Sequence, residues 1–444
     1  MKNLFFLLFL CNYSFLSADD LPDQLLDPDS QSLGISVGGE EEFPEEEGKF
    51  SGDLRLRFYP KSPETGCWQL SSFTERTRLR RIKGEETQEI GWLVNRHKDD
   101  PVVNTGNFFR YELIKYWLKA ENTLGLNKII LGSYELQYNQ GLVFYAPYLE
   151  LVRPWQIKAR GILEEKGTSR NVYLFGAAGQ KNIGPWQIDG FYSQKKMDSA
   201  KNVDDSADFD LRADTKNSLP LDTSRSLERY RGLEEKLAGS KIEYRWQKNS
   251  WVNVLGYTAY YTPEIRPDTA EEILFQGTKN TVLGLAGKHE WNEFQLIGEY
   301  AKNLAYGQAW TSGLFWQKKP LNFWLLLWDY SPDYQNPYAS GITSYGRRDS
   351  VFNETGQTLG LEYKTRINTF NIYFRPAKAS IPQRTENIID TSAEWRANYR
   401  YSFYPGWEIF TDYQNLDYDV NRNPNYPFSD TSKGMDLEKK NSAA

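Results

Sequence analysis

Apolar and polar side chains alternate with a period of two along most of the chain, from about Ser51 onward. The clearest runs are Lys241–Gln247 (KIEYRWQ), Gln357–Thr365 (QTLGLEYKT) and Glu394–Ser402 (EWRANYRYS). Successive side chains of a β-strand point to opposite faces of the sheet. The alternation therefore predicts strands with one apolar, aromatic-rich face and one face that carries both signs of charge.

Alternation alone does not separate a soluble β-sandwich, which hides its apolar face, from a membrane barrel, which turns that face to lipid. The lengths of the runs and of their connections favour the barrel. Most runs have about 9–12 residues, close to the roughly 9–11 that a tilted strand needs to cross a bilayer. Short turns such as Lys248–Ser250 and Arg366–Asn368 tend to alternate with long polar stretches such as Gln194–Glu235 and Ser331–Gly356. Short periplasmic turns and long outer loops are typical of outer-membrane barrels.

We therefore predict an all-β fold, an antiparallel transmembrane β-barrel of about 16–18 strands. In such a barrel the charged faces line a wet lumen. This assigns as lumen-facing Glu243, Arg245, Glu299, Glu362, Lys364, Arg375, Glu394, Arg396, Arg400 and Asp412. Aromatic residues also crowd the ends of the runs, which predicts interfacial girdles. They are Tyr257, Tyr260, Tyr261, Trp324, Trp328, Tyr330, Tyr373 and Phe374.

Composition agrees with this class. Aromatic residues make up 15 % of the 444 residues, although the mean hydropathy is only −0.67. A soluble core would draw more on Leu, Ile and Val. No uninterrupted apolar stretch reaches the roughly 20 residues of a transmembrane helix. If the chain lies in a membrane, it must cross as strands.

The ends of the chain differ from its middle. Residues 1–18 read as an export signal, with Lys2, an apolar run and a cleavage site after Ala18. Residues 19–49 are acidic and predict a disordered linker. The barrel is expected over 50–418, and 419–444 form a polar tail. Either the barrel closes through Trp407–Asn415, or the sequence is incomplete at its C-terminus.

Three segments resemble a known family. Ile129–Tyr145 reads IILGSYELQYNQGLVFY, Leu227–Leu233 reads LERYRGL and Asn353–Leu361 reads NETGQTLGL. In combination they resemble the outer-membrane barrel region of the exported helix-hairpin-helix proteins of Bacteroidetes-type bacteria. The helix-hairpin-helix modules, which suggest DNA contact, are absent from this sequence. The resemblance thus implies fold and location, and it marks a signature of Tyr134, Gln137, Gln140 and Gly141. A strand end, bulge and turn is the favoured interpretation of that signature, with a constriction or docking point as the alternative.

No motif for catalysis is present. The two histidines, His97 and His289, have no metal-ligand spacing. Cys67 is the single cysteine that would remain after removal of the export signal, and we expect it to be a plain thiol. No Walker loop, GxSxG, HExxH or CxxC occurs. We therefore expect no catalytic residue, no cofactor and no metal.

Three functions follow as hypotheses. The leading one is a non-enzymatic outer-membrane barrel, acting as a pore or as a platform for periplasmic or surface partner proteins, with lipid as its main contact. The second, by family analogy alone, is a part in nucleic-acid uptake or surface assembly. Direct nucleic-acid binding is not expected, because the chain has a net charge of −6. The third is a secreted soluble β-rich glycan-binding protein.

Overall fold

The structure is a computed structural model. It describes residues 26–27, 32–42, 49–61, 69–96, 113–144, 160–167, 173–209, 211, 231–267, 274–341, 351, 353–379, 391–404, 407–419 and 436–441. These residues form 23 strands, which confirms the all-β class. The predicted export signal, Cys67 and His97 lie outside the described residues. No helix that could cross a membrane occurs in the part of the chain that the structure describes.

The chain divides into two compact units, which are described separately. Unit 1 comprises Met1–Lys83, Glu89–Tyr116 and Pro220–Asp222. Its strands are β1 (Leu26–Asp27), β2 (Ser32–Glu42), β3 (Lys49–Lys61), β4 (Gln69–Lys83) and most of β5 (Glu86–Arg96). Strands β1 to β4 pair in order and antiparallel.

Two of these strands lie where a linker was expected. β1 and β2 fall inside residues 19–49, so disorder was the wrong prediction for the described part of that range. The reason lies in the sequence of β2, where Leu33, Ile35 and Val37 alternate with small residues before the acidic run begins. That short alternation is enough for a strand. The acidic composition of the whole segment concealed it.

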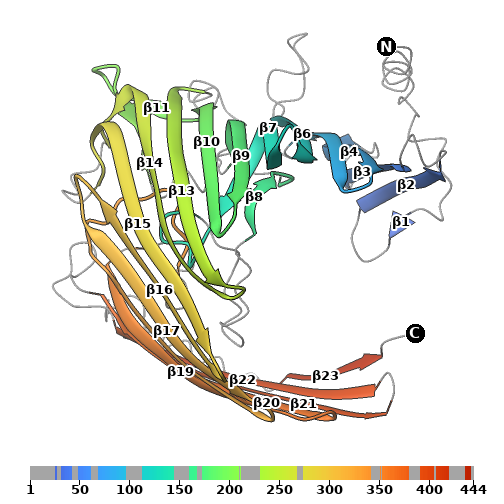
Figure 1. Ribbon diagram of the computed structural model, residues 1–444, viewed down its shortest axis with the longest axis vertical. Coiled ribbons are helices and arrows are strands. Elements are labelled where there is room, and N and C mark those ends of the chain that lie inside the picture. The colour runs from blue at the N-terminus through green and yellow to red at the C-terminus, as the bar shows by residue number, and fades with distance from the viewer. Residues whose placement is uncertain are drawn as a thin grey trace. The chain divides into compact units, whose positions relative to one another are not determined.

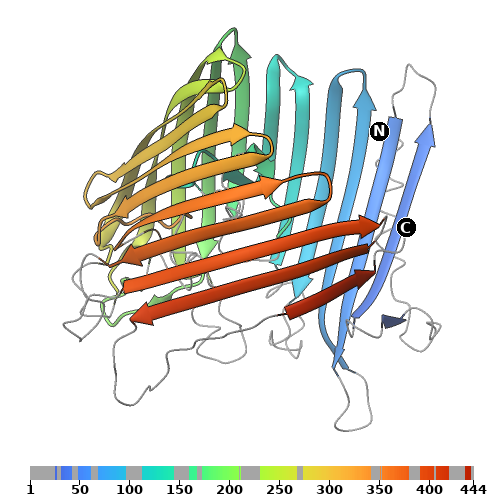
Figure 2. The same ribbon diagram turned by 90° about the horizontal axis from the view of Figure 1, so that it is seen from below.

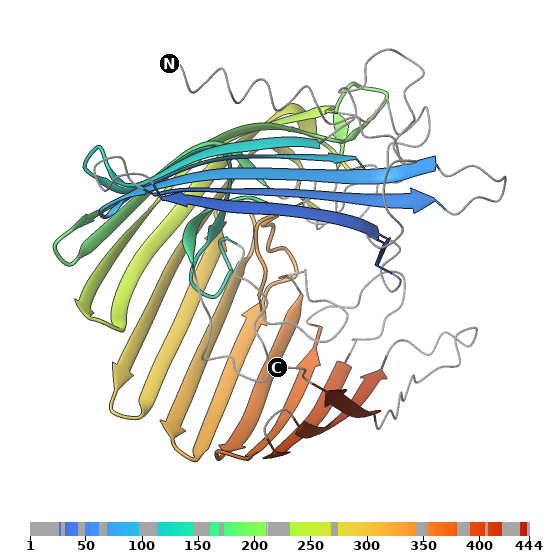
Figure 3. The same ribbon diagram turned by 90° about the vertical axis from the view of Figure 1, so that its right-hand side faces the viewer.

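Unit 2 comprises Gly84–Gln88, Trp117–Leu219 and Thr223–Ala444. Figures 1, 2 and 3 show its long strands side by side. They are β6 (Leu113–Thr123, from Trp117), β7 (Leu126–Gln137), β8 (Gly161–Glu164), β9 (Leu174–Ile183), β10 (Trp186–Met197), β11 (Ala200–Lys201), β12 (Ala207–Asp208), β13 (Leu233–Gln247), β14 (Ser250–Ile265), β15 (Gly277–Trp291), β16 (Phe294–Asn303), β17 (Gln308–Lys318), β18 (Leu321–Tyr330), β19 (Glu354–Lys364), β20 (Asn368–Lys378), β21 (Thr391–Tyr404), β22 (Trp407–Asp419) and β23 (Asp436–Asn441).

Neighbouring long strands of unit 2 pair antiparallel. The register runs without a break through β15, β16, β17 and β18. Two-residue turns such as Lys248–Asn249 and Asn292–Glu293 join strands at one end of the sheet. Strand β23 pairs with β22 and lies within the predicted polar tail. The 23 strands of the described residues exceed the expected 16–18, because short strands such as β11 and β12 lie inside stretches assigned to loops, and β1, β2 and β23 lie inside the stretches assigned to the linker and the tail.

The two faces of the unit 2 sheet differ in a way that is the reverse of a soluble protein. In β10, Gln187, Asp189 and Lys195 are buried, whereas Ile188 and Tyr192 are exposed. The same alternation holds in β13, β14 and β16. We call the face that carries Asp189 the inner face and the face that carries Ile188 the outer face. The charged side chains of these strands are therefore buried on the inner face, and the outer face exposes large apolar side chains.

Candidate functional site: the inner face and the segments that cover it

Buried ion pairs link β10 to β13 on the inner face. Asp189 and Lys241 are cross-strand partners, as are Lys195 and Glu235. The Lys241 ammonium lies 3.4 Å from Asp189 and 3.0 Å from Glu243, and that of Lys195 lies 3.8 Å from Glu235. The two cross-strand pairs have opposite polarity and are six positions apart on β10. Burial removes water from these charges, so each depends on its partner.

A second polar cluster lies on β20, β21 and β22. Arg375 and Glu394 form a buried ion pair, and the Tyr373 hydroxyl donates to Glu394 at 2.8 Å. Arg396 pairs with Asp412 through two nitrogens. The arrangement is a chain of charge-assisted hydrogen bonds across three neighbouring strands.

The structure places the ten residues assigned to the lumen as follows. Five are buried on the inner face, with exposed fractions of 2–3 %: Glu243, Glu299, Glu362, Arg375 and Glu394. The others are partly or largely exposed: Arg245, which pairs with Glu243, and Lys364, Arg396, Arg400 and Asp412. Lys364 and Arg245 lie close to the short turns, which accounts for their exposure.

Two segments that are not strands cover this face. The first inner segment, Tyr138–Phe144, follows β7, and the second inner segment, Ser331–Gly341, follows β18. Both lie on the concave side of β13–β16 in Figure 1. Leu142 and Val143 of the first and Tyr334 and Gln335 of the second are fully buried. Neither segment was predicted to fold inward from the sequence.

The two inner segments hold each other through hydrogen bonds to backbone carbonyls. The Tyr334 hydroxyl donates to Leu142 O at 2.6 Å. The Asn336 side-chain amide donates to Leu142 O at 2.7 Å and to Val143 O at 3.0 Å. The Ser340 N–H donates to Gly141 O at 2.9 Å. The segments are 190 or so positions apart along the chain yet form one interlocked layer.

The first inner segment is fixed to three strands of the sheet. Glu299 on β16 accepts backbone N–H groups of the segment. The side-chain amide of Asn139, in the segment, exchanges two hydrogen bonds of 3.1 and 2.8 Å with that of Asn253, which lies on β14. On β15, the position of a Cβ on Gly284 is occupied by the side chain of Val143. A glycine is therefore required there for the segment to lie against the sheet.

Each inner segment also places a tyrosine on one of the buried ion pairs. The Lys241 ammonium lies 4.8 Å from the ring centre of Tyr138, and that of Lys195 lies 5.2 Å from the ring centre of Tyr338. The Tyr338 hydroxyl donates to Glu235. These are cation–π contacts in a desolvated setting, where they are strongest. Burial raises the pKa of the Tyr338 phenol well above its usual value, and the Glu235 charge raises it further, so the hydroxyl stays protonated.

The family-like signature lies at the start of the first inner segment. Tyr134 is buried on β7 and donates to Tyr192 O at 2.9 Å, and β7 ends at Gln137. Gln140 donates its N–H to Glu299. Gly141 has a φ of 89°, which favours glycine, and its N–H donates to Tyr138 O. The signature thus forms a strand end and a turn, and that turn carries the contact with the sheet.

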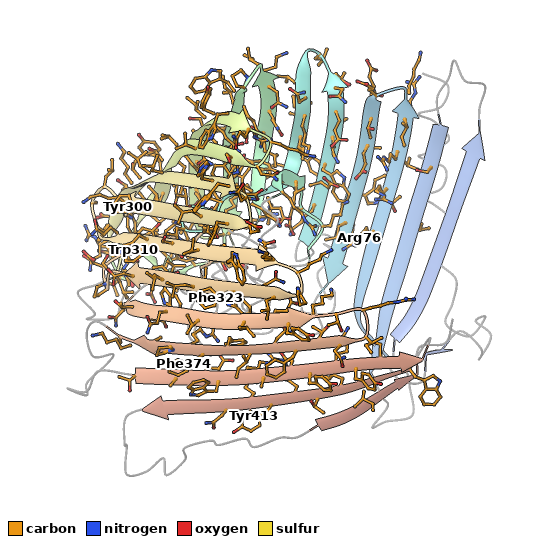
Figure 4. The ribbon with its side chains drawn as sticks, turned by 60° about the horizontal axis from the view of Figure 1, so that its bottom comes forward. Arg76, Tyr300, Trp310, Phe323, Phe374 and Tyr413 are labelled. Atoms are coloured by element: carbon orange, nitrogen blue, oxygen red, sulfur yellow. The ribbon has the colours of Figure 1, made fainter. Side chains whose placement is uncertain are left out.

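The outer face carries exposed aliphatic side chains and a belt of aromatic rings near the short turns. Neighbouring ring centres in the belt are 4.8–6.3 Å apart along Trp186, Tyr244, Trp246, His289, Trp291 and Phe294. Further outer-face aromatic residues, Tyr300, Trp310, Phe323, Phe374 and Tyr413, are labelled in Figure 4. Such a belt is typical of a lipid–water boundary.

The girdle predicted from the sequence was wrong for most of its members. Six of the eight residues are buried on the inner face: Tyr257, Tyr261, Trp324, Trp328, Tyr330 and Tyr373. Only Tyr260 and Phe374 lie on the outer face. Whether a residue lies at the end of a strand does not decide on which face of the sheet its side chain lies. That depends on whether it occupies an odd or an even position along the strand.

The described residues contain no cluster of three or more His, Cys, Asp or Glu that could hold a metal ion. No protein-family model and no curated protein matches the chain. Among solved structures, the chain is similar to Pseudomonas aeruginosa OpdQ, with 12 % identity, a TM-score of 0.41 and coverage of 84 % of this chain and 91 % of the other. It is similar to a BenF-like porin from Pseudomonas fluorescens Pf-5, with 11 % identity, a TM-score of 0.41 and coverage of 85 % and 95 %. It is also similar to the outer membrane protein OpdK of P. aeruginosa, with 10 % identity, a TM-score of 0.42 and coverage of 84 % of this chain and 94 % of the other. Likeness at this level assigns neither an activity nor a solute to the chain.

Proposed function

We propose that this chain is a non-enzymatic β-barrel of the bacterial outer membrane that forms a pore restricted by the two inner segments. One observation carries the proposal: the reversed burial of unit 2. Ile242, Leu285 and Leu296 are between 44 and 52 % exposed. Glu243, which directly follows Ile242, is buried, and so is Glu299, whose cross-strand partner Ala286 directly follows Leu285.

The apolar side chains of the outer face fit contact with lipid better than contact with water. Exposed aliphatic side chains occur on β10, β13, β14, β15, β16 and β19, and the outer-face side chains of β17 and β18 between them are partly exposed. Surfaces of this kind are typical of contact with lipid or with another protein. The aromatic belt near the short turns favours lipid, because Trp and Tyr gather at both boundaries of the hydrocarbon layer.

The inner face supports a pore rather than an enzyme. Asp189, Glu235 and Glu394 pair with basic side chains, whereas Glu299 accepts N–H groups of the first inner segment. These residues hold one another or the inner segments instead of converging on a substrate position. A glycosidase would need two carboxyl groups about 5–9 Å apart across a sugar. Charged linings and inward segments set which solutes pass through a barrel.

The three alternative functions, a soluble glycan-binding protein, a platform for partner proteins and a part in nucleic-acid uptake, have weaker structural support than the pore. A soluble glycan-binding protein would present its aromatic rings to water beside hydrogen-bonding groups, whereas outer-face rings such as Trp246 and Trp291 share their strands with exposed Ile242, Leu283 and Leu285. The platform version of the leading hypothesis shares the fold and differs only in lacking a passage. A part in nucleic-acid uptake stays a prediction by analogy, with no structural feature in its favour.

Two measurements test the proposal. The full chain should sediment with the outer membrane and resist extraction by carbonate or urea, because its apolar face lies in lipid. Purified protein should produce discrete conductance steps in planar bilayers. Recovery of folded protein in the soluble fraction without detergent would refute the membrane location. Membrane insertion with no conductance in the wild type or in any variant that frees the inner segments would refute the pore and leave the platform.

A further inference from the structure

Glu299 is a buried carboxylate whose partners lie in the first inner segment: three backbone N–H groups and the side-chain amide of Asn139. It lies on the inner face of β16 with 3 % of its surface exposed. It accepts from Gln140 N at 2.7 Å, from Leu142 N at 3.2 Å and from Val143 N at 3.3 Å. Among the described residues, no basic side chain forms an ion pair with it. The carboxylate therefore depends on the turn, and the turn depends on the carboxylate.

The three N–H groups form a concave anion-binding site within the chain. Positive φ values at Asn139 (50°) and Gly141 (89°) accompany a turn in which the N–H groups of Gln140, Leu142 and Val143 point to Glu299, while the Gly141 N–H donates to Tyr138 O. Such backbone concavities bind anions. A buried N–H group without an acceptor is costly. Removal of the carboxylate would leave three such groups at once.

The second inner segment depends on the same turn without touching Glu299. Its Tyr334 and Asn336 donate to the carbonyls of Leu142 and Val143, the two residues whose N–H groups Glu299 accepts. The Leu142–Val143 peptide group is thus held on both sides, with its N–H bound by Glu299 and its carbonyl bound by Tyr334 and Asn336. A shift of the turn removes the acceptors of the Tyr334 hydroxyl and the Asn336 amide, and leaves the second inner segment with its direct contacts to the sheet, from Asn303 to Gln335 O and from Tyr257 to Asn336 Oδ1.

We propose that Glu299 is a positioning residue that locks both inner segments to the sheet, so that loss of its carboxylate frees them together. The effect on solute passage rests on the proposed pore function. The lock itself does not, because it is a property of the folded chain. Glu299 thereby sets the width of the passage through residues that it holds, not by contact with the solute.

Cysteine accessibility tests the lock independently of conduction. Ala339→Cys reports on the second inner segment and Val143→Cys on the first, each in a background with Cys11→Ser and Cys67→Ser. Both positions are buried, so a bulky maleimide should label neither in folded protein in detergent. Glu299→Gln keeps the side-chain volume and one acceptor oxygen, but it places an NH2 donor against at least one of the three N–H groups. We expect labelling at both positions to rise about tenfold or more, the factor that one lost buried hydrogen bond produces in a local opening equilibrium.

A matched control separates the lock from a general loss of buried charge. Glu362→Gln makes the same chemical change at a glutamate of equal burial on β19, where Asn322 donates to it at 2.6 Å. It should leave labelling at positions 143 and 339 at the parent level. Equal labelling in both variants would overturn the assignment to Glu299.

The remaining outcomes also decide the proposal. Labelling at position 143 alone would overturn the joint release, and labelling at neither position would overturn the lock. If Glu299→Gln does not fold, Glu299→Asp replaces it: a carboxylate one methylene shorter should give intermediate labelling at both positions, and parent-level labelling would overturn the proposal. In planar bilayers, Glu299→Gln should raise the single-channel conductance. Release by labelling without any conductance would leave the lock standing and refute the pore.

Discussion

Strands β10–β16 and strands β17–β18 fill the same inner face by different means. Along β10–β16 the inner face mixes polar side chains with apolar ones such as Leu255, Tyr257 and Ile297. Ion pairs join β10 to β13, and hydrogen bonds attach the two inner segments to the sheet. On β18, which reads LNFWLLLWDY, both faces are apolar. Trp324, Leu326 and Trp328 are fully buried on its inner face, while Phe323 and Leu325 on the outer face are partly exposed.

Glycines on the next strand make the aromatic arrangement possible. Trp324 and Gly360 are cross-strand partners, as are Trp328 and Gly356. Each indole ring occupies the position that a Cβ on its partner glycine would take. An aromatic ring over a glycine is a known means of filling a sheet surface. An inward position therefore need not be wet: one part of the face is closed by polar contacts, and the other by tight packing.

The largest effect is expected in the packed part. Trp324→Ala removes a fully buried indole and should lower the free energy of unfolding by about 3–5 kcal/mol. The measurement is denaturant unfolding in detergent, followed by tryptophan fluorescence. Phe323→Ala on the adjacent, partly exposed outer position is the control, because detergent or lipid can fill the space. Equal losses in the two variants would show that the inner aromatic layer has no special packing role.

The contrast between the two parts also explains how much the sequence could predict. Where charged and apolar residues alternate, odd and even positions of the strand predict which residues share a face. Glu243 and Glu299 are buried on the inner face, opposite the exposed Ile242 and Leu296. On β18 the alternation is between apolar residues, so it contains no signal about the face. Trp324 and Trp328 were therefore placed in a girdle although they are buried inside.

The inner segments escaped prediction for a different reason. The stretch from Ser331 onward is polar in composition and reads as an outer loop. Its contacts depend on residues 190 or so positions away, at Leu142 and Val143, and no local pattern encodes such a pairing. The composition of the stretch did contain a signal that it folds inward. Tyr334 and Tyr338 lie on either side of Asn336, whereas exposed loops are rich in small polar residues, Gly and Pro. The Gly141 turn was foreseen, but its acceptor Glu299 was not.

The next effect concerns the outer face and the solvent that touches it. Leu285→Arg places a charge between the aromatic belt and the opposite end of β15, on a side chain that is 52 % exposed. If lipid surrounds this face, insertion into vesicles should weaken by about 2–4 kcal/mol. Lys279→Arg, which keeps a positive charge on the same face near the end of the strand, is the control. An unchanged folding yield for Leu285→Arg in vesicles would mean that water covers the outer face.

A smaller effect is expected where the first inner segment lies on β15. Gly284→Ala adds a methyl group where the Val143 side chain lies, and overpacking of this kind costs about 1–3 kcal/mol. Val143→Ala in the same chain should recover most of the loss, because it removes the atom in the way. Unfolding of the single and double variants gives the coupling energy. Strict additivity would show that Gly284 and Val143 do not meet.

The smallest effect tests how the polar part shares its acceptors. Tyr334→Phe deletes the hydroxyl that donates to Leu142 O at 2.6 Å. The loss should be only about 1 kcal/mol, because Leu142 O keeps the Asn336 amide at 2.7 Å and is never left without a donor. Asn336→Leu removes a donor to both Leu142 O and Val143 O and should cost more than Tyr334→Phe in the same unfolding measurement. A polar layer built from shared acceptors tolerates loss of one donor, whereas an indole packed on glycine has no substitute. If Tyr334→Phe were as damaging as Trp324→Ala, this distinction between the two parts of the inner face would not hold.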